Sequence, residues 1–183
     1  MMSVKVNIEN MVSAINLEQK LDLKDLSSKV KGLEYNPESF PAAICHLHEP
    51  RVAILLFSSG KAIVTGAHSE DDVIRALEKL REKLSEAEIE IVHNPVVEVQ
   101  NIVASADVGL KVNLDVLALE SFNCEYEPEQ FPGLVLRLDT PKISILVFSS
   151  GKLVVTGAKD PRDLRLAAEK TRETIIGCGA QLT

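Results

Sequence analysis

The sequence predicts an α+β fold built from two related halves, and two observations support this prediction. Residues 10–67 align without a gap on residues 101–158, at a constant offset of 91. Within each copy, strand-like alternation of apolar and polar residues gives way to helical spacing in the same order. An offset this large exceeds the roughly 20 to 50 residues of solenoid units. Each copy is therefore half of one molecule, and we divide the chain into repeats of residues 1–91 and 92–183.

The first copy contains the elements in a clear order. Alternation from Val4 predicts a strand, and a short helix is expected to begin at Asp22 and end near Gly32. Three strands then follow, at residues 40–48, 52–57 and 61–67. The connections between them are short and rich in turn residues, which is typical of antiparallel hairpins.

A longer helix closes each copy. In the first it runs from Ser69 to about Ser85, with an apolar stripe on one side. In the second it begins at Asp160-Pro161, where an N-cap residue precedes a proline at the first helical position. The simplest assembly is one continuous antiparallel sheet from both halves, with all four helices on one face and a pseudo-twofold axis between the copies. Residues 86–95 link the halves.

Composition limits the kind of protein. The 183 residues are 45% hydrophobic, which suffices for one globular unit. Because no apolar run approaches about 18 residues and the N-terminus alternates, we expect neither a membrane span nor a secretory signal, and hence a soluble, cytoplasmic protein. The cysteines, Cys45, Cys124 and Cys178, are odd in number and far apart, which argues against disulfides and a zinc site. Cys45 is expected to be a small core residue.

The face of the sheet away from the helices has an unusual composition. Strand parity places one residue set there in each copy: Asn10, Val12, Phe40, Ala42, Ile44, Leu55, Phe57, Ile63 and Thr65 in the first, and Asn101, Val103, Phe131, Gly133, Val135, Arg137, Leu146, Phe148, Val154 and Thr156 in the second. A solvated face would carry charged residues instead. A broad apolar surface of this kind indicates a binding site, and the alternatives are a second buried layer or a homodimer interface.

The aromatic residues make the prediction more specific. Of five Phe residues, only Phe122 falls outside the repeated positions. Phe40 and Phe57, like Phe131 and Phe148, lie on either side of a hairpin and are expected to meet as a pair at each end of the sheet. Two such apolar wedges suit insertion between base steps of DNA. The net charge of −7 opposes DNA binding, although the acids concentrate in the predicted outer helices.

Other chemistry lacks a basis in this sequence. The Ser-Gly-Lys strings lack the frame of a phosphate-binding loop and lie in a hairpin. His46 and His48 share one strand face, but the second repeat has Arg137 and Asp139 there, so we expect no metal site. With no nucleophile and base repeated in a cleft, we expect neither an enzyme nor a cofactor.

Several repeated strings resemble one known family, the TATA-box-binding proteins in their short archaeal form. The strings are QNIV at residues 100–103, EYEPEQFPGL at 125–134, and FSSGK and VTGA in both copies. The resemblance covers essentially the whole chain. It implies a saddle with a concave ten-stranded sheet that binds the minor groove of A·T-rich promoter DNA, and four helices on the convex face. Partners implied by it are transcription factor B and, indirectly, RNA polymerase. Initiation would then take place at the nucleoid of an archaeal cell.

The resemblance also implies roles for residues. Members of this family are themselves a standard example of minor-groove binding with inserted apolar wedges, so the DNA bend is implied and not deduced. The four paired Phe residues would intercalate. Base contacts would come from Asn10, Asn101, Thr65, Thr156, Val12, Val103, Ile63, Val154, Leu55 and Leu146. Phosphate contacts would come from Ser59, Lys61, Ser150, Lys152, Arg137 and Lys159, and the contact to transcription factor B from Glu127 and Glu129.

The chain departs from the family pattern in its first half. His46 stands opposite Arg137 in the repeat, and His68 opposite Lys159. We therefore expect weaker, or more salt- and pH-sensitive, DNA binding through the first half. Two other functions stay open: a protein-interaction module of the same fold that has lost promoter binding, and a DNA-repair-associated domain with the same duplicated sheet. Off DNA, the apolar face would also suit a homodimer.

Overall fold

The computed structural model describes residues 4–91 and 94–182. The chain divides into two compact units, one of residues 10–100 and the other of residues 1–9 together with 101–183. The division falls inside two long strands, β1 (Lys5–Asn16) and β6 (Val97–Asp107), so each of them contributes a segment to both units. We describe each unit by itself.

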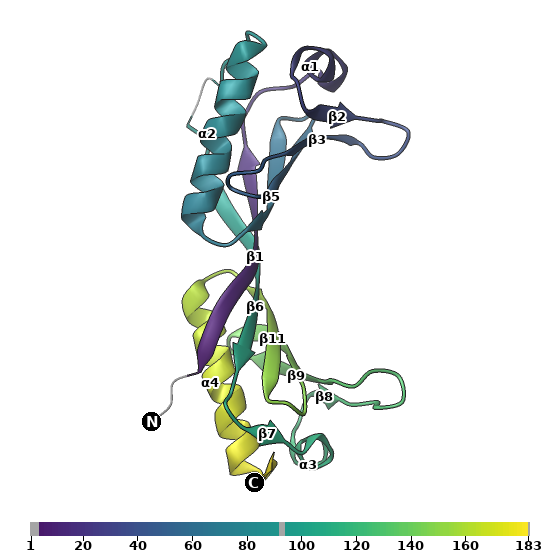
Figure 1. Cartoon of the computed structure of the whole chain (residues 1–183), viewed down its shortest axis with the longest axis vertical. Helices are drawn as coiled ribbons and strands as arrows, with labels where there is room; N and C mark the ends of the chain where they lie inside the picture. The colour runs from purple at the N-terminus through teal and green to yellow at the C-terminus, as the bar shows by residue number, and fades with distance from the viewer. Residues whose placement is uncertain (1–3, 92–93, 183) are drawn as a thin grey trace. The chain divides into compact units, whose positions relative to one another are not determined.

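The unit of residues 10–100 contains most of the first repeat (Figure 1). After β1 come α1 (Leu23–Lys29), β2 (Leu33–Tyr35), β3 (Ala42–His46), β4 (Ala53–Phe57), β5 (Lys61–Ala67) and α2 (Glu70–Glu86). The strands follow the order β2-β3-β4-β5-β1, and every pair within this run is antiparallel. The expected hairpins β3–β4 and β4–β5 are therefore confirmed.

The other unit repeats this plan. It contains β7 (Lys111–Val112), α3 (Leu114–Glu120), β8 (Cys124–Glu125), β9 (Leu134–Asp139), β10 (Lys142–Val147), β11 (Lys152–Ala158), α4 (Pro161–Gly177) and β12 (Gln181–Leu182). Its strand order is β6-β11-β10-β9-β8, which mirrors the first unit element for element. Over the described part of the chain, ten strands belong to one antiparallel sheet, and the predicted fold class is confirmed.

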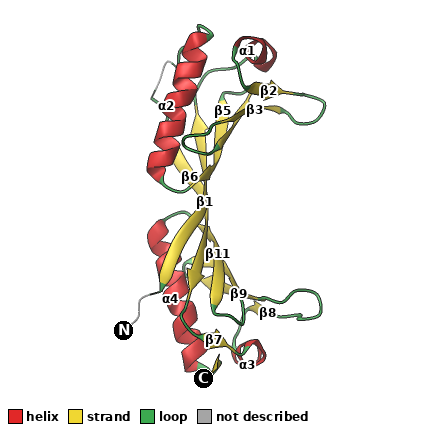
Figure 2. Cartoon of the chain, viewed as in Figure 1, coloured by secondary structure: helices red, strands yellow, loops and turns green. Residues whose placement is uncertain are grey.

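The core of each unit lies between the sheet and one long helix. Figure 2 shows α2 beside the strands of one unit and α4 beside those of the other. The helix buries one apolar stripe, formed in α2 by Val73, Ala76, Leu80 and Leu84. Facing strands alternate between fully buried and half-buried positions, as in β5. The short helices α1 and α3 bury only two leucines each, Leu23 and Leu26 in α1 and Leu114 and Leu117 in α3.

Both long helices begin where the sequence predicts. The Ser69 hydroxyl accepts a hydrogen bond from the backbone N–H of Asp72, and the Asp160 carboxylate accepts one from the backbone N–H of Arg162. These side chains satisfy N–H groups that have no partner within the helix. Pro161 occupies the first helical turn, where its missing N–H costs nothing.

Three details differ from the sequence prediction. The middle strands are shorter than expected, since β3 begins at Ala42 and β4 at Ala53. The edge strands β2 and β8 have only three and two residues, too few for an alternation pattern to reveal. A small second sheet, β7 with β12, is present in the second unit, and no strand was predicted there.

The predicted link at residues 86–95 lies between α2 and β6, although its residues 92 and 93 are outside the described range. In the part of the chain that the structure describes, no helix combines the length and apolarity needed to cross a membrane.

Candidate nucleic-acid interface

The sheet face opposite the long helices carries the predicted apolar set. Its six aliphatic base-contact candidates are all half-buried, in contrast to the fully buried neighbours on either side along each strand. They are Val12, Leu55, Ile63, Val103, Leu146 and Val154. Leu55 pairs directly with Ile63, and Leu146 with Val154, so adjacent strands present these side chains side by side. Each unit therefore offers a continuous apolar strip that no element of that unit covers.

A pair of phenylalanines lies at the outer end of each strip. The ring centroids of Phe40 and Phe57 are 6.5 Å apart, and those of Phe131 and Phe148 are 6.0 Å apart. Both pairs are tilted or edge-on, an arrangement that aromatic quadrupoles favour. The outer rings, Phe40 and Phe131, are 42% and 45% exposed. The predicted pairing is thus confirmed, and each pair presents an apolar edge to solvent.

The two asparagines have fixed side-chain orientations. The Asn10 side-chain oxygen accepts a hydrogen bond from the Gly66 backbone N–H at 2.7 Å, and its amide nitrogen donates to the Thr65 hydroxyl at 3.3 Å. The other unit has the same two hydrogen bonds: the Gly157 backbone N–H donates to the Asn101 side-chain oxygen at 2.8 Å, and the Asn101 amide nitrogen donates to the Thr156 hydroxyl at 3.4 Å. With its oxygen occupied, each carboxamide presents only an N–H donor outward, and each threonine keeps its own O–H to donate.

The backbone N–H groups that hold these side-chain amides belong to two glycines, Gly66 and Gly157. The pairing of β1 with β5 shifts register between Met11 and Ser13, and that of β11 with β6 shifts between Thr156 and Ala158. The shifts are β-bulges, and the extra residues, Gly66 and Gly157, have φ of 96° and 107°. Other residues rarely adopt this backbone conformation. The repeated VTGA string was visible in the sequence, but its role as amide anchor follows only from the bulge.

The serines and lysines of the repeated FSSGK strings lie at an exposed hairpin, which is β4–β5 in the first repeat and β10–β11 in the second. Backbone N–H groups of Lys61 and Lys152 approach the hydroxyl oxygens of Ser59 and Ser150, at 3.4 Å in both units. Because each hydroxyl accepts this bond, its proton stays available to a phosphate oxygen. Among the described residues, neither lysine ammonium takes part in an ion pair.

The remaining basic candidates differ between the units. Arg137 forms an exposed ion pair with Glu125 at 3.0 Å, so part of its guanidinium already has a carboxylate partner. Lys159 is exposed. At the matching positions of the first repeat, His46 and His68 are exposed too, and the His68 backbone N–H binds the carboxylate of Asp72.

Glu127 and Glu129 lie in the loop between β8 and β9. The Glu127 carbonyl accepts hydrogen bonds from the backbone N–H groups of Gln130 and Phe131, as the Asn36 carbonyl does from Ser39 and Phe40 in the first repeat. The two loops thus have the same backbone turn. Both glutamate side chains point into solvent, which leaves them free for a partner.

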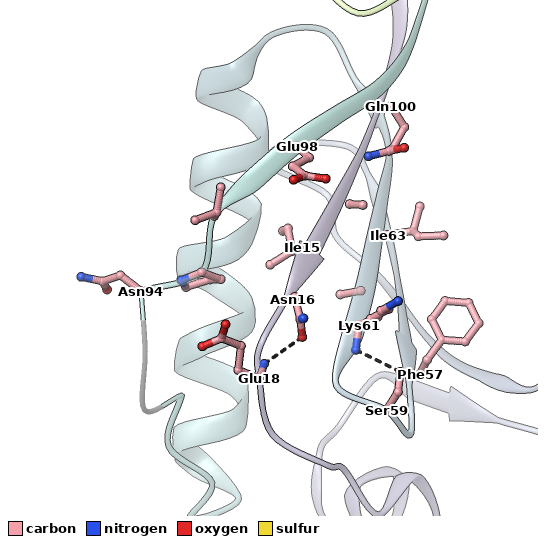
Figure 3. A pocket seen from close by; sticks show the side chains of 14 residues that line it. Ile15, Asn16, Glu18, Phe57, Ser59, Lys61, Ile63, Asn94, Glu98 and Gln100 are labelled. Carbon is pink, nitrogen blue, oxygen red and sulfur yellow. Dashed lines mark hydrogen bonds between the residues drawn. The ribbon is translucent and has the colours of Figure 1, made fainter.

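Sequence reasoning missed a pair of grooves beside the hairpins. The groove in the unit of residues 10–100 has a volume near 690 Å³ and is lined by Phe57, Lys61, Ile63, Glu98 and ten further residues (Figure 3). In the other unit a groove of about 740 Å³ is lined by Phe148, Lys152, Val154, Lys5 and Asn7, among others. The 91-residue offset could have matched Lys5 and Asn7 with Val96 and Glu98, but alternation alone gave no reason to place them beside the phenylalanines.

Comparison with known proteins identifies the family. The family model described as transcription factor TFIID, or TATA-binding protein, matches residues 5–87 and again residues 96–177. The chain belongs to the TATA-binding-protein family. The TATA-box-binding protein of Pyrococcus furiosus is 49% identical over 170 residues, which are 93% of this chain and 89% of that protein. The TATA-box-binding protein of Archaeoglobus fulgidus is 45% identical over 181 residues, covering 98% and 99%.

A solved structure agrees with the fold. The structure described as Methanococcus jannaschii TBP matches with a TM-score of 0.88 at 43% identity, covering 94% of this chain and 99% of that one. The sequence resemblance to archaeal TATA-box-binding proteins is therefore confirmed. Because the family is one of transcription factors, the expectation that the chain is not an enzyme is confirmed as well.

Proposed function

We propose that this protein binds A·T-rich promoter DNA in the minor groove and acts as a general transcription initiation factor. The observation that carries the proposal is the pair of anchored asparagines. Each presents only hydrogen-bond donors within an apolar strip, and the matching partner is a surface of acceptors. In the minor groove, A·T and T·A pairs show only the A N3 and T O2 acceptors, whereas G·C pairs add a donor, the guanine amino group.

The fixed amides exclude guanine for a physical reason. A free carboxamide could rotate and offer its oxygen to a guanine amino group. Here that oxygen is held by the N–H of Gly66 or Gly157, at 2.7 and 2.8 Å. Rotation would break that bond. At the half-buried Gly66 it would leave the donor unpaired, which costs about 1–3 kcal/mol, whereas Gly157 is exposed and its N–H can bind water instead. The aliphatic strip beside the asparagines would also desolvate the guanine amino group without a partner.

The phenylalanine pairs supply the wedges. We propose that Phe40 with Phe57, and Phe131 with Phe148, enter base steps at the two ends of the site and kink the duplex toward the major groove. Unstacking costs a few kcal/mol per step, and the apolar contact of the rings and the strip offsets it. Ser59, Lys61, Ser150, Lys152, Arg137 and Lys159 would hold the phosphates and fix the register.

The bent complex would recruit transcription factor B through Glu127 and Glu129, and RNA polymerase through that factor, at the nucleoid of the cell. Off DNA, two copies would cover each other's apolar faces as a homodimer. In each case the support is exposure: the two carboxylates are in solvent, and the aliphatic strip is uncovered within each unit. We keep the duplication boundary at residues 1–91 and 92–183 as our proposal for how the gene arose.

A mobility-shift assay tests the proposal. An A·T-rich promoter duplex and a G·C-substituted duplex are titrated with the wild type and with Asn10→Asp plus Asn101→Asp. Aspartate keeps the acceptor for the glycine N–H and loses the outward donor, so the fold should persist. We expect the wild type to prefer the A·T duplex by at least about tenfold, and the aspartate variant to lose roughly 100-fold in affinity for it.

The matched control is Asn10→Gln plus Asn101→Gln, which keeps the donor on a longer side chain. A wild type that binds both duplexes equally, or binds neither while still associating with transcription factor B, would contradict promoter recognition. The second result would favour the protein-interaction module.

A further inference from the structure

The two grooves beside the hairpins are equivalent in position but not in charge. Ten lining residues of one groove match ten of the other at the 91-residue offset, including Phe57 with Phe148, Ser59 with Ser150 and Lys61 with Lys152. The equivalence makes the differences informative. Where the groove of residues 10–100 has Val96 and Glu98, the other has Lys5 and Asn7.

Counting the lining side chains gives opposite signs. The first-repeat groove has one lysine, Lys61, against the carboxylates of Glu18 and Glu98. The second-repeat groove has two lysines, Lys5 and Lys152, against Asp107. One further carboxylate adjoins the second groove, because Glu9 accepts the hydroxyl proton of Ser105 at 2.7 Å. When Glu9 is included, the second groove has two lysines and two carboxylates, so it is still more positive by one charge than the first, which has one lysine and two carboxylates.

The wider surroundings point the same way. The unit of residues 10–100 contains 10 basic and 15 acidic residues, whereas the other unit contains 10 and 12. At the rim, His46 and His68 stand where the second repeat has Arg137 and Lys159. In the described chain Glu98 has no ion-pair partner, so its charge is not neutralised locally.

We propose that the two halves hold the DNA backbone unequally. The groove with Lys5 and Lys152 binds phosphates more strongly than the groove in which Glu98 and Glu18 oppose Lys61, so that Lys5 and Glu98 make the half that contains residues 101–183 hold the backbone more tightly. This inference rests on the proposed DNA binding and adds residues that the family resemblance did not supply. Its physical basis is direct: cations in contact with phosphates release condensed counterions, while uncompensated carboxylates prevent close approach.

A duplex with neutralised phosphates separates the two grooves. A palindromic A·T-rich site is prepared in three forms: unmodified, with uncharged methylphosphonates at the phosphates of one end, and with methylphosphonates at both ends. A palindrome offers two equivalent orientations. If the groove with Lys5 supplies most of the phosphate affinity, neutralising one end removes only one of the two orientations and costs at most about twofold. Neutralising the second end then removes the remaining contact, with a loss of about fivefold or more.

Charge-exchange variants provide the matched controls. Val96→Lys with Glu98→Asn gives the first groove the residues of the second, and should make the two losses equal on a logarithmic scale. It should also steepen the dependence of log affinity on log salt by about 1 to 2, as expected for new phosphate contacts. Lys5→Val with Asn7→Glu makes both grooves acidic and should reduce both losses to about twofold. Lys5, Asn7, Val96 and Glu98 are all exposed, so the variants should fold, which thermal unfolding checks.

Equal successive losses in the wild type would overturn the inference, as would a Val96→Lys with Glu98→Asn variant whose two losses stay unequal. A wild type that fails to bind the unmodified duplex would instead overturn the proposed function. The unmodified duplex therefore tests DNA binding, and the two modified duplexes test whether the grooves bind phosphates unequally.

Discussion

Gly133 lies beneath the second phenylalanine pair, and the structure allows us to predict how far the rings would move, and how much stability would change, if this residue were alanine. A Cβ added at Gly133 would lie 2.9 Å from Cε1 of Phe131 and 3.1 Å from Cε1 of Phe148. Ordinary contacts begin near 3.4 Å, so the Phe131 ring would have to move by about 0.5 Å. The first repeat has Ala42 at the matching position, and its ring pair is correspondingly wider, at 6.5 Å against 6.0 Å.

The energetic cost of Gly133→Ala should be small. Both close contacts are to the far ends of side chains, and Phe131 is 45% exposed, so its ring can move toward solvent. Displacing a ring from its rotamer costs about 0.5–1.5 kcal/mol. Gly133 has no left-handed backbone angle, so alanine also restricts the unfolded chain and contributes about 0.4–1 kcal/mol of stability. We expect a net change within about 1 kcal/mol, or roughly 4 °C in the melting temperature.

Thermal unfolding and a crystal structure of the variant provide the measurement. The centroid distance between Phe131 and Phe148 should widen from 6.0 Å toward the 6.5 Å of the first pair. The reverse change, Ala42→Gly, is the control and should let Phe40 and Phe57 approach. A loss of more than about 3 kcal/mol would show that the glycine is required by the backbone and not by the rings. An unchanged ring spacing would also refute the argument.

Three further predictions concern charge. Replacing His46 with Arg and His68 with Lys should strengthen DNA binding at pH 7.5 and steepen its salt dependence, and an unchanged salt titration would contradict the proposed weakness of the first half. Burial raises the pKa of the Cys45 thiol, and the positive charge of Lys83 opposes that shift. The neutral thiol therefore stabilises the fold below the ordinary pKa of 9.0, and this stabilisation is lost as pH rises through the raised pKa. Between pH 8 and 11, the free energy of unfolding should fall less in Cys45→Ala than in the wild type. Reversing Glu127 and Glu129 to Arg should abolish ternary-complex formation with transcription factor B while leaving the DNA shift intact; undiminished ternary complex would leave the two residues as a solvated turn.

The sequence predicted much of the fold because its signals are local and repeated. Helix starts at Ser69 and Asp160 depend on capping chemistry within three residues, and the structure places both N-caps there. Strand alternation correctly placed Leu146 on the face away from the helices, where it is half-buried while its neighbours Ile145 and Val147 are fully buried. The edge strands and the β7–β12 sheet were missed because two or three residues contain no period, and their pairing depends on partners far along the chain.

The site was predictable in residue type but not in geometry. Repetition singled out Asn10 and Asn101, yet the direction of each carboxamide depends on a bulge in a neighbouring strand, and no spacing in the sequence encodes a backbone N–H. The grooves were missed for a different reason. Their charge difference comes from Lys5 in β1 and Glu98 in β6. The lysines that share these grooves, Lys152 and Lys61, lie far away in the sequence, in the hairpins β10–β11 and β4–β5.

The first strand has a consequence for how the chain is made. Residues 4–9 belong to the unit completed by residues 101–183, where Val4 is buried and its carbonyl accepts a hydrogen bond from Arg165 at 3.4 Å. Residues 4–9 are therefore synthesised well before the partners with which they pack, whereas residues 10–100 form a contiguous unit that can fold earlier. Cutting the gene at the repeat boundary would leave the second half with an unpaired edge at β6, and that edge would favour association between copies. Each unit thus depends on a strand segment whose remainder belongs to the other unit.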